Sequence, residues 1–138
     1  MGYPSVQKRP FIKSGRSILQ LKEKELDIQK AFVKWLKIKY PKVLFSASAG
    51  GMRTYRKEAG KMKAAGYTKG CPDIMIFEPR GDYCGLFIEL KRPDGKPTPE
   101  QIAFIDGLKA RGYRATVCYG YEEITKEVDV YFTHSAKH

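Results

Sequence analysis

The sequence predicts an α/β fold in which a central mixed β-sheet is flanked by helices. Two apolar segments, 74–77 and 84–91, are separated by a turn signal at residues 80–82 and predict a pair of adjacent strands. Helical patterns lie before and after this pair, over residues 18–40 and from Thr98 onward. The chain has 138 residues, of which 42% are hydrophobic, and this is enough for one hydrophobic core.

The first predicted helix, over residues 18–40, ends before Pro41 because a residue that precedes proline disfavours the helical conformation. Its core stripe has Trp35 beside it and is formed by three residues at helical spacing: Ile28, Phe32 and Leu36. Glu25 and Gln29 fall on the same stripe, where charged side chains are unusual. Glu25 is therefore either solvated just beyond the buried patch or directed into an acidic site, and the pattern alone leaves both open.

A basic segment follows this helix. Residues 43–49 predict a strand, and residues 52–65 predict a helix with Gly66 as its C-cap. Six cations lie in or shortly after this second helix: Arg53, Arg56, Lys57, Lys61, Lys63 and Lys69. Such side chains on a helix surface are often only solvated. Their density here, with tyrosines interleaved, favours contact with phosphates.

The charge of the chain is unevenly distributed. The formal net charge is +11, but residues 1–71 hold 17 Lys and Arg against 4 Asp and Glu, whereas residues 72–138 hold 9 against 11. A segregated basic half is typical of a protein that binds a polyanion. No apolar run approaches the ~18 residues of a membrane span, and no wide lipid-facing stripe accompanies the cations. The composition therefore favours nucleic acid as the partner and places the acidic site in the second half.

The two central strands carry the candidate chemistry. Asp73 stands at the entrance of the first strand, and Glu89 and Lys91 share one face of the second, because side chains alternate along a strand. A Glu-x-Lys on a strand is usually only a solvated face. Two carboxylates beside an ammonium also provide hard oxygen ligands for Mg²⁺ or Mn²⁺ and a cation for a negatively charged reacting group.

The remaining segments complete the predicted fold. Thr98 is a predicted N-cap, with Gln101 at the capping-box position of the third helix. Residues 114–119 predict a strand next to the strand of Glu89. Residues 121–126 predict a short helix, and residues 128–132 predict an edge strand.

Three segments in this order, KGCPDIMIF, GLFIELKRPDGKPTPEQ and GYRATVCYGYEE, resemble the VRR-NUC family of the PD-(D/E)xK nuclease superfamily. The resemblance extends over residues 25–123 and includes Glu25-Leu-Asp-Ile-Gln29 in the first helix. It implies a restriction-endonuclease-like core and metal-dependent hydrolysis of DNA. One departure is that Ser48-Ala49 stands where an Asn is commoner in the family, which leaves the role of that segment open.

The resemblance also implies a catalytic set, in chain order: Glu25, Asp73, Glu89, Lys91 and Gln101. Mg²⁺ or Mn²⁺ would be held by Asp73 and Glu89, by the Leu90 backbone carbonyl, and by Glu25 directly or through water. Lys91 would position the attacking water or stabilise negative charge in the transition state. The family also places a matching glutamine at the active site, a role that can coexist with capping.

Stand-alone members of the family are associated with dimers that act on branched DNA such as four-way junctions, so we expect a homodimer that nicks four-way junctions, flaps or other branched DNA. We therefore expect a structure-selective endonuclease. One alternative is a nucleic-acid-binding module that has lost catalysis. Another is a restriction-type or exonucleolytic nuclease without selectivity for branched DNA.

The N-terminal segment and the cysteines lead to the remaining predictions, which concern domain organisation, assembly and cellular location. Residues 1–17 are predicted to form a basic arm that precedes a nuclease domain at residues 18–138. A dimer interface would draw on apolar side chains that otherwise cover the monomer's own core: Phe11, Ile12, Ile18, Leu19 and Leu21. No secretory leader is visible, and the three cysteines read as reduced thiols, which predicts a bacterial or phage-infected host cytosol.

Overall fold

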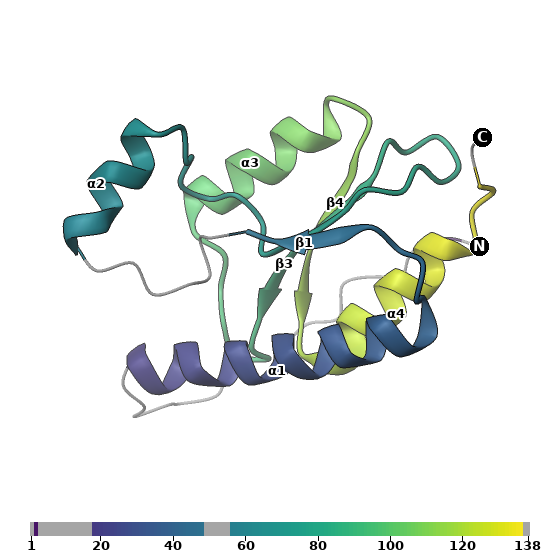
Figure 1. The fold of residues 1–138 in the computed structure, drawn as a ribbon, viewed down its shortest axis with the longest axis horizontal. Coiled ribbons are helices and arrows are strands. Elements are labelled where there is room, and N and C mark those ends of the chain that lie inside the picture. The colour runs from purple at the N-terminus through teal and green to yellow at the C-terminus, as the bar shows by residue number, and fades with distance from the viewer. Residues whose placement is uncertain (1, 3–17, 49–55, 137–138) are drawn as a thin grey trace.

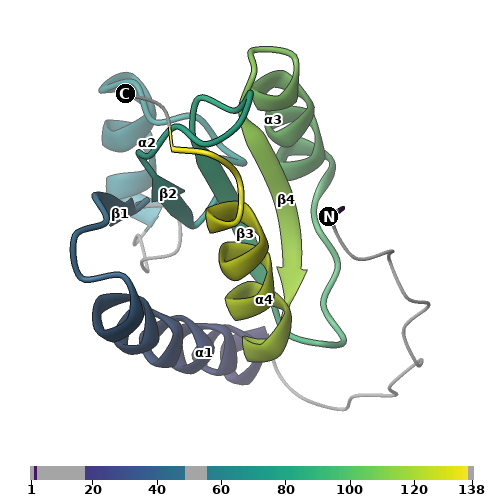
Figure 2. The same cartoon turned by 90° about the vertical axis from the view of Figure 1, so that its right-hand side faces the viewer.

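The described residues of the computed structural model, 2, 18–48 and 56–136, form a four-stranded mixed sheet with helices on both faces (Figures 1 and 2). The elements follow one another along the chain as α1 (Ile18–Lys39), β1 (Phe45–Ala47), α2 (Arg56–Ala64), β2 (Ile74–Ile76), β3 (Leu86–Lys91), α3 (Pro99–Lys109), β4 (Arg114–Tyr119) and α4 (Tyr121–Phe132). The predicted α/β class is confirmed.

The sheet order is β1-β2-β3-β4. β2 pairs antiparallel with both β1 and β3, so the predicted central hairpin is present. β4 runs parallel to β3, with Glu89 opposite Val117, and this confirms the predicted neighbour of the Glu89 strand. The sheet is therefore mixed, as the sequence predicts.

The main core lies between the sheet and the pair α1 and α4. It is formed by apolar side chains from both helices and three strands: Phe32, Leu36, Ile74, Ile76, Leu86, Ile88, Leu90, Cys118, Ile124, Val128 and Tyr131. Strand alternation directs Glu89 and Lys91 to the opposite face of β3. That face is covered by α3, whose Gln101 bonds to Glu89. Glu89 and Gln101 thus meet on the α3 side of the sheet.

Several predicted boundaries are close to the observed ones. α1 ends at Lys39, ahead of Pro41. The strand predicted at 43–49 is shorter, Phe45–Ala47, and Ala49 lies outside the described residues. α2 begins at Arg56, whereas residues 52–55 of the predicted helix are likewise undescribed. Gly66 follows α2 with φ of 106°, a left-handed conformation that favours glycine at a helix end.

The C-terminal segment corrects one prediction. Residues 128–132 are not an edge strand but the second half of α4, which is a single helix from Tyr121 to Phe132. Ile124, Val128 and Tyr131 lie at helical spacing and are each 0% exposed. Helical packing on the core therefore overrides the β-branched character of this segment.

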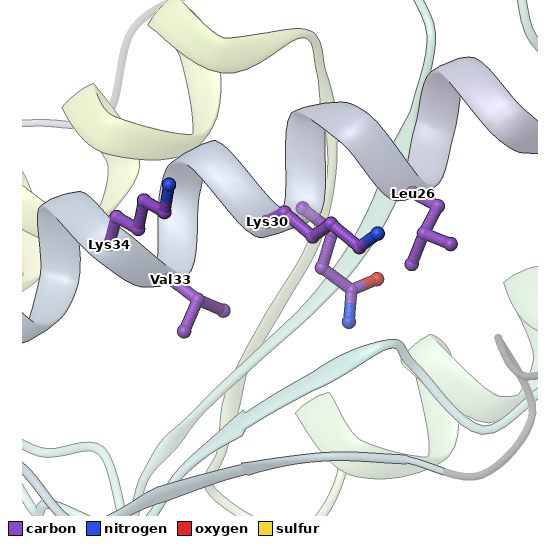
Figure 3. Close-up of a pocket in the computed structure, with 5 residues that line it drawn as sticks. Leu26, Lys30, Val33 and Lys34 are labelled. Carbon is purple, nitrogen blue, oxygen red and sulfur yellow. The ribbon is translucent and has the colours of Figure 1, made fainter.

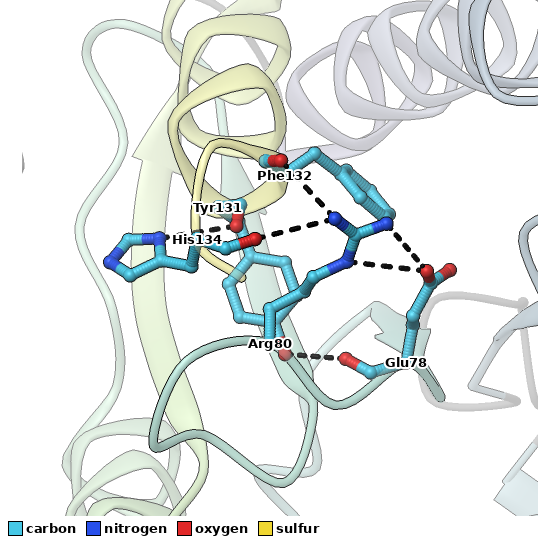
Figure 4. A network of polar contacts seen from close by, with 5 residues as sticks. All are labelled: Glu78, Arg80, Tyr131, Phe132 and His134. Atoms are coloured by element: carbon cyan, nitrogen blue, oxygen red, sulfur yellow. Dashed lines mark hydrogen bonds and ion pairs between the residues drawn. The ribbon is translucent and has the colours of Figure 1, made fainter. Parts of the chain in front are cut away.

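The end of α4 is tied to the loop after β2 (Figure 4). The Arg80 guanidinium donates to Glu78 Oε1 at 2.8 Å and to the carbonyls of Phe132 and His134. It also lies 4.8 Å from the centre of the Phe132 ring. The Tyr131 hydroxyl donates to the Glu78 carbonyl at 2.5 Å. This network fixes the end of α4 against the central hairpin.

The remaining sequence expectations are only partly covered by the structure. The arm at residues 1–17 lies outside the described part of the chain apart from Gly2, and the side chains of residues 18–23 are not described. Among the residues that are, no helix is both long and apolar enough to cross a membrane. The three cysteines are free thiols: Cys71, Cys84 and Cys118.

Candidate active site

Two carboxylates meet where β2 begins and β3 ends. Asp73 immediately precedes β2, and the register that pairs Ile74 with Ile88 places Asp73 across from Glu89. The Leu90 backbone N–H donates to Asp73 Oδ2 at 2.8 Å. The strand pairing thus brings together two acids that are sixteen residues apart in the sequence.

Glu89 is held by two neighbours through only one of its oxygens. Glu89 Oε1 accepts a hydrogen bond from Gln101 Nε2 at 2.7 Å and lies 3.3 Å from Lys91 Nζ. The other oxygen, Oε2, is buried and has no hydrogen-bond partner among the described residues. Because an unpartnered buried oxygen is unfavourable, Oε2 is the natural place for a cation or a ligand to bind.

The two acids strongly influence one another. Burial, followed by repulsion from Asp73, raises the pKa of Glu89 to about 8, while Lys91 acts in the opposite direction. Burial also raises the pKa of Asp73, although the Leu90 N–H and Lys91 partly offset this effect. Close carboxylates titrate as a pair. Near neutral pH the pair therefore retains a proton unless a cation replaces it.

Glu25 of α1 lies beside this pair rather than in solvent beyond the core stripe. Burial raises the pKa of Glu25, and Asp73 raises it further, whereas Lys91 and the backbone of Arg92 lower it. These interactions show that the Glu25 carboxyl shares the electrostatic environment of the site. A third acid, from a helix distant in the sequence, thus joins the two strand acids.

Gln101 connects the N-terminus of α3 to the acidic pair. The Gln101 backbone N–H donates to Thr98 Oγ1 at 3.2 Å, and the Thr98 backbone N–H donates to Gln101 Oε1 at 2.8 Å, which completes a capping box. With its oxygen engaged in the cap, the side-chain amide presents its nitrogen to Glu89. One amide therefore serves the cap and the site at once.

The donor set fits a hard divalent ion in an open site. Within the described part of the chain, no group of three or more His, Cys, Asp or Glu side chains is placed to hold a metal ion by itself. Mg²⁺ commonly uses one or two carboxylates and keeps waters or substrate oxygens as its other ligands. Asp73 and Glu89, with Oε2 unpartnered, match that pattern better than a closed cage of protein ligands.

Three residues that the sequence did not assign to the site lie at its edge. The Ser48 backbone N–H donates to the Asp73 carbonyl at 2.8 Å, and Ser48 Oγ is buried with no partner among the described residues. Burial raises the pKa of Tyr67 and of Cys71, and the carboxylates of Asp73 and Glu89 raise both further. Only Ser48 had a signal in the sequence, because it departs from the asparagine commoner in the family.

The predicted phosphate-binding side chains are only partly located. Lys61 and Lys63 are exposed on α2, which makes at most sparse contacts with the other elements. Lys69 is 78% exposed, and its Nζ lies 3.7 Å from a carboxylate oxygen of Glu100. For the other three, either the whole residue or the side chain is not described: Arg53, Arg56 and Lys57.

Comparison with known proteins points to one family. The family described as the VRR-NUC domain matches residues 18–122. A solved structure described as a VRR_NUC domain protein is similar to this one, with a TM-score of 0.72 and 29% sequence identity over 81% of this chain and 90% of that chain. No curated protein sequence gives a match.

Proposed function

This chain belongs to the VRR-NUC family, a nuclease-type family with a restriction-endonuclease-like fold, and from that premise we propose that it is a metal-dependent deoxyribonuclease. Its substrate is branched DNA, such as a four-way junction or a flap. One observation carries the proposal: the buried pair of Asp73 and Glu89, with Oε2 of Glu89 unpartnered and Lys91 beside it. A purely structural pair of acids would have its oxygens satisfied by protein donors.

In this proposal Mg²⁺ or Mn²⁺ would be held by Asp73, Glu89 and the Leu90 backbone carbonyl. Glu25 would support the ion directly or through water, since its carboxyl shares the electrostatic environment of Asp73 and Lys91. When bound, such an ion supplies Lewis-acid polarisation of the phosphate and lowers the pKa of a water molecule. The protein's own task is to keep two carboxylates together at a fixed spacing.

Lys91 and Gln101 position the charges around the reacting phosphate. The Lys91 ammonium lies 3.3 Å from Glu89 Oε1 and is 11% exposed, so it brings a positive charge into a poorly solvated site. There it offsets the negative charge that builds up on the phosphate in the transition state. Gln101 fixes the orientation of the Glu89 carboxylate through the bond to Oε1.

The preference for branched DNA is supported by the kind of contacts that α2 offers. Lys61 and Lys63 are exposed on α2, and contacts of lysine with phosphates position the DNA without reading its bases. Such contacts carry no direct sequence information. Selectivity therefore depends on the shape of the DNA, in keeping with the resemblance to stand-alone members of the family.

A cleavage assay on a set of matched substrates tests the proposal. Linear, nicked, flapped and four-way DNA of one common sequence are incubated with Mg²⁺, Mn²⁺ or EDTA. We expect cleavage only with a divalent ion and faster cleavage of the branched substrates. Equal rates on all forms contradict structure selectivity, and binding without cleavage in any condition favours the non-catalytic module.

A further inference from the structure

A groove of about 350 Å³ runs along one flank of α1 (Figure 3). We call it the α1 groove, and the described residues that line it are Leu26, Gln29, Lys30, Val33 and Lys34. Leu26 is 45% exposed, Val33 is partly buried, and the two point the same way from the helix. Lys30 and Lys34 are exposed. The α1 groove thus has an apolar floor with two lysines on its rim.

The α1 groove begins at the proposed catalytic site. Gln29 lies one helical turn after Glu25, which interacts with Asp73 and Lys91. Val33 lies a further turn along, ~12 Å from Glu25 at 1.5 Å per residue. At the ~3.4 Å spacing of a stacked strand, that length covers about three nucleotides. A DNA strand that leaves the scissile phosphate along α1 would enter this groove.

The charge of the α1 groove indicates which class of molecule binds in it. Lys30 and Lys34 form no ion pair with any other described residue. The arm at residues 1–17 holds four cations and no acid, so its charge does not complement these lysines. A second copy of α1 would place the same lysines face to face. A polyanion is the complementary partner.

The apolar floor distinguishes an unpaired strand from a duplex. A duplex keeps its bases stacked inside, and contacts to its outer phosphates need cations only. An unpaired strand exposes flat base faces, which pack on aromatic or apolar side chains. A cavity of about 150 Å³ accepts a benzene ring, so the α1 groove has room for a base beside Leu26 and Val33.

We propose that the α1 groove binds two or three unpaired nucleotides next to the scissile phosphate. Their bases pack on Leu26 and Val33, and their phosphates lie at Lys30 and Lys34. This inference rests on the proposed nuclease function and narrows its substrate. The preferred DNA has a single-stranded segment beside the cut, as in a flap, rather than a fully paired junction.

Metal-free binding measurements test the inference without any cleavage. Fluorescence anisotropy in EDTA compares a labelled single strand of about 15 nucleotides with a duplex of the same length. We expect the double variant Leu26→Ser, Val33→Ser to lose about fivefold or more in affinity for the single strand, while its affinity for the duplex stays within about twofold. The matched control, Ile38→Ser with Lys126→Gln, removes an exposed aliphatic side chain and an exposed lysine elsewhere and leaves both affinities unchanged.

A variant that is expected to gain affinity distinguishes a specific effect on binding from a general folding defect. Leu26→Tyr offers an aromatic ring for stacking, and we expect it to raise the affinity for the single strand about threefold with no change for the duplex. Equal losses for both DNA forms in the floor variant, or no loss for either, overturn the inference. A change from dimer to monomer mass in that variant also overturns it, because the groove would then bind a second copy.

The binding test of the α1 groove and the cleavage test of the proposed nuclease function can fail independently of one another. If the floor variant loses single-strand binding but the wild-type protein cuts no DNA with Mg²⁺, the nuclease proposal fails and the assignment of the groove stands. If the wild-type protein cuts flaps and the floor variant binds single strands normally, the groove assignment alone fails.

Discussion

Glu89 combines near-complete burial with an incomplete set of partners. Gln101 and Lys91 both approach Oε1, and Oε2 has no partner among the described residues. Burial and Asp73 raise its pKa to about 8. Without a cation, this residue must either keep a proton or carry an unfavourable buried charge. Its environment therefore makes the stability of the metal-free protein depend on pH.

The first prediction concerns that dependence. The folded protein binds the Glu89 proton more tightly than the unfolded chain, in which the ordinary pKa is 4.5. The contribution of Glu89 to the free energy of unfolding is therefore greatest below pH 4.5 and falls as the pH rises to about 8. In EDTA we expect Tm to fall over this window by about 4 °C or more, equivalent to ~1 kcal/mol.

Thermal unfolding in EDTA at several pH values measures this effect. Glu89→Gln carries no ionisable group at this position, so we expect a flatter profile and a higher Tm than wild type at pH values near 8. A saturating divalent ion should reduce the fall in the wild-type protein, because it favours the ionised pair. The same slope in wild type and variant would show that Glu89 does not titrate in this window.

A second prediction separates the two roles of Gln101. Gln101→Glu keeps an oxygen to accept from the Thr98 N–H but replaces the donor to Glu89 with a repelling carboxylate. We expect the rate of cleavage to fall about 10- to 100-fold. Thr98→Ala removes the cap alone and should cost about 1 kcal/mol of stability with little loss of rate. Equal rates for Gln101→Glu and wild type would leave Gln101 with a capping role only.

The sequence predicted that two acids and a lysine lie together, because they stand in order on two predicted strands, and the strand pairing places them so. Asp73, Glu89 and Lys91 follow from strand alternation and hairpin pairing alone. The surroundings of Glu25 remained open. Helical periodicity shows which face of the first helix carries Glu25, but it does not show which residues lie opposite that face. Ser48 departs from the asparagine commoner in the family, but this departure does not predict its buried hydroxyl, which depends on contacts formed only in the folded chain.

At the scale of elements, α4 shows where local pattern fails. Residues 128–132 contain alternating β-branched residues that suit a strand. The same segment also continues the helical spacing of Ile124, Val128 and Tyr131. The choice is made by the rest of the fold, because the core face of the sheet requires cover, and α4 buries these three side chains against it. The local sequence alone therefore does not determine whether this segment forms a strand or a helix.

The exposed lysines of α2 lead to a prediction about how DNA affinity depends on salt concentration. Lys61 and Lys63 are exposed on α2, and each phosphate contact adds about 0.9 to the log–log slope of affinity against salt on duplex DNA. Contact with ~6 phosphates gives a slope near −5 in wild type. We expect Lys61→Gln with Lys63→Gln to make the slope shallower by about 1.8.

Binding titrations at several salt concentrations, in EDTA and with one duplex, provide the measurement. Lys109→Gln with Lys126→Gln changes two exposed lysines on other helices and serves as the control. An unchanged slope for the α2 variant would mean that these ammonium groups are only solvated. The same comparison extends to the undescribed cations of the set: Arg53, Arg56 and Lys57.

At the scale of the whole molecule, one acidic set cuts one strand, so paired cuts in branched DNA require two copies. A two-fold dimer presents two such sites at a fixed separation. We predict a homodimer built in part from the N-terminal arm at residues 1–17 and the first helix, in keeping with the resemblance to stand-alone family members.

Light scattering on the intact chain and on a shortened chain that starts at Glu23 measures the assembly. We expect a dimer mass for the intact chain at micromolar concentration and a monomer for the shortened one. Faster loss of junction cleavage than of nicking should accompany dissociation. A monomer mass for the intact chain with full junction cleavage would remove the argument for paired sites.

Asp73 and Glu89 together are proposed to support phosphodiester hydrolysis. The most direct test of this claim is the single-turnover rate of cleavage of one flapped DNA in Mg²⁺, with protein in excess, for wild type, Asp73→Asn and Glu89→Gln. We predict a rate about 1000-fold lower in each variant, with DNA affinity in EDTA within severalfold of wild type. Rates within a few fold of wild type in either variant would contradict the claim, as would undiminished wild-type cleavage in EDTA.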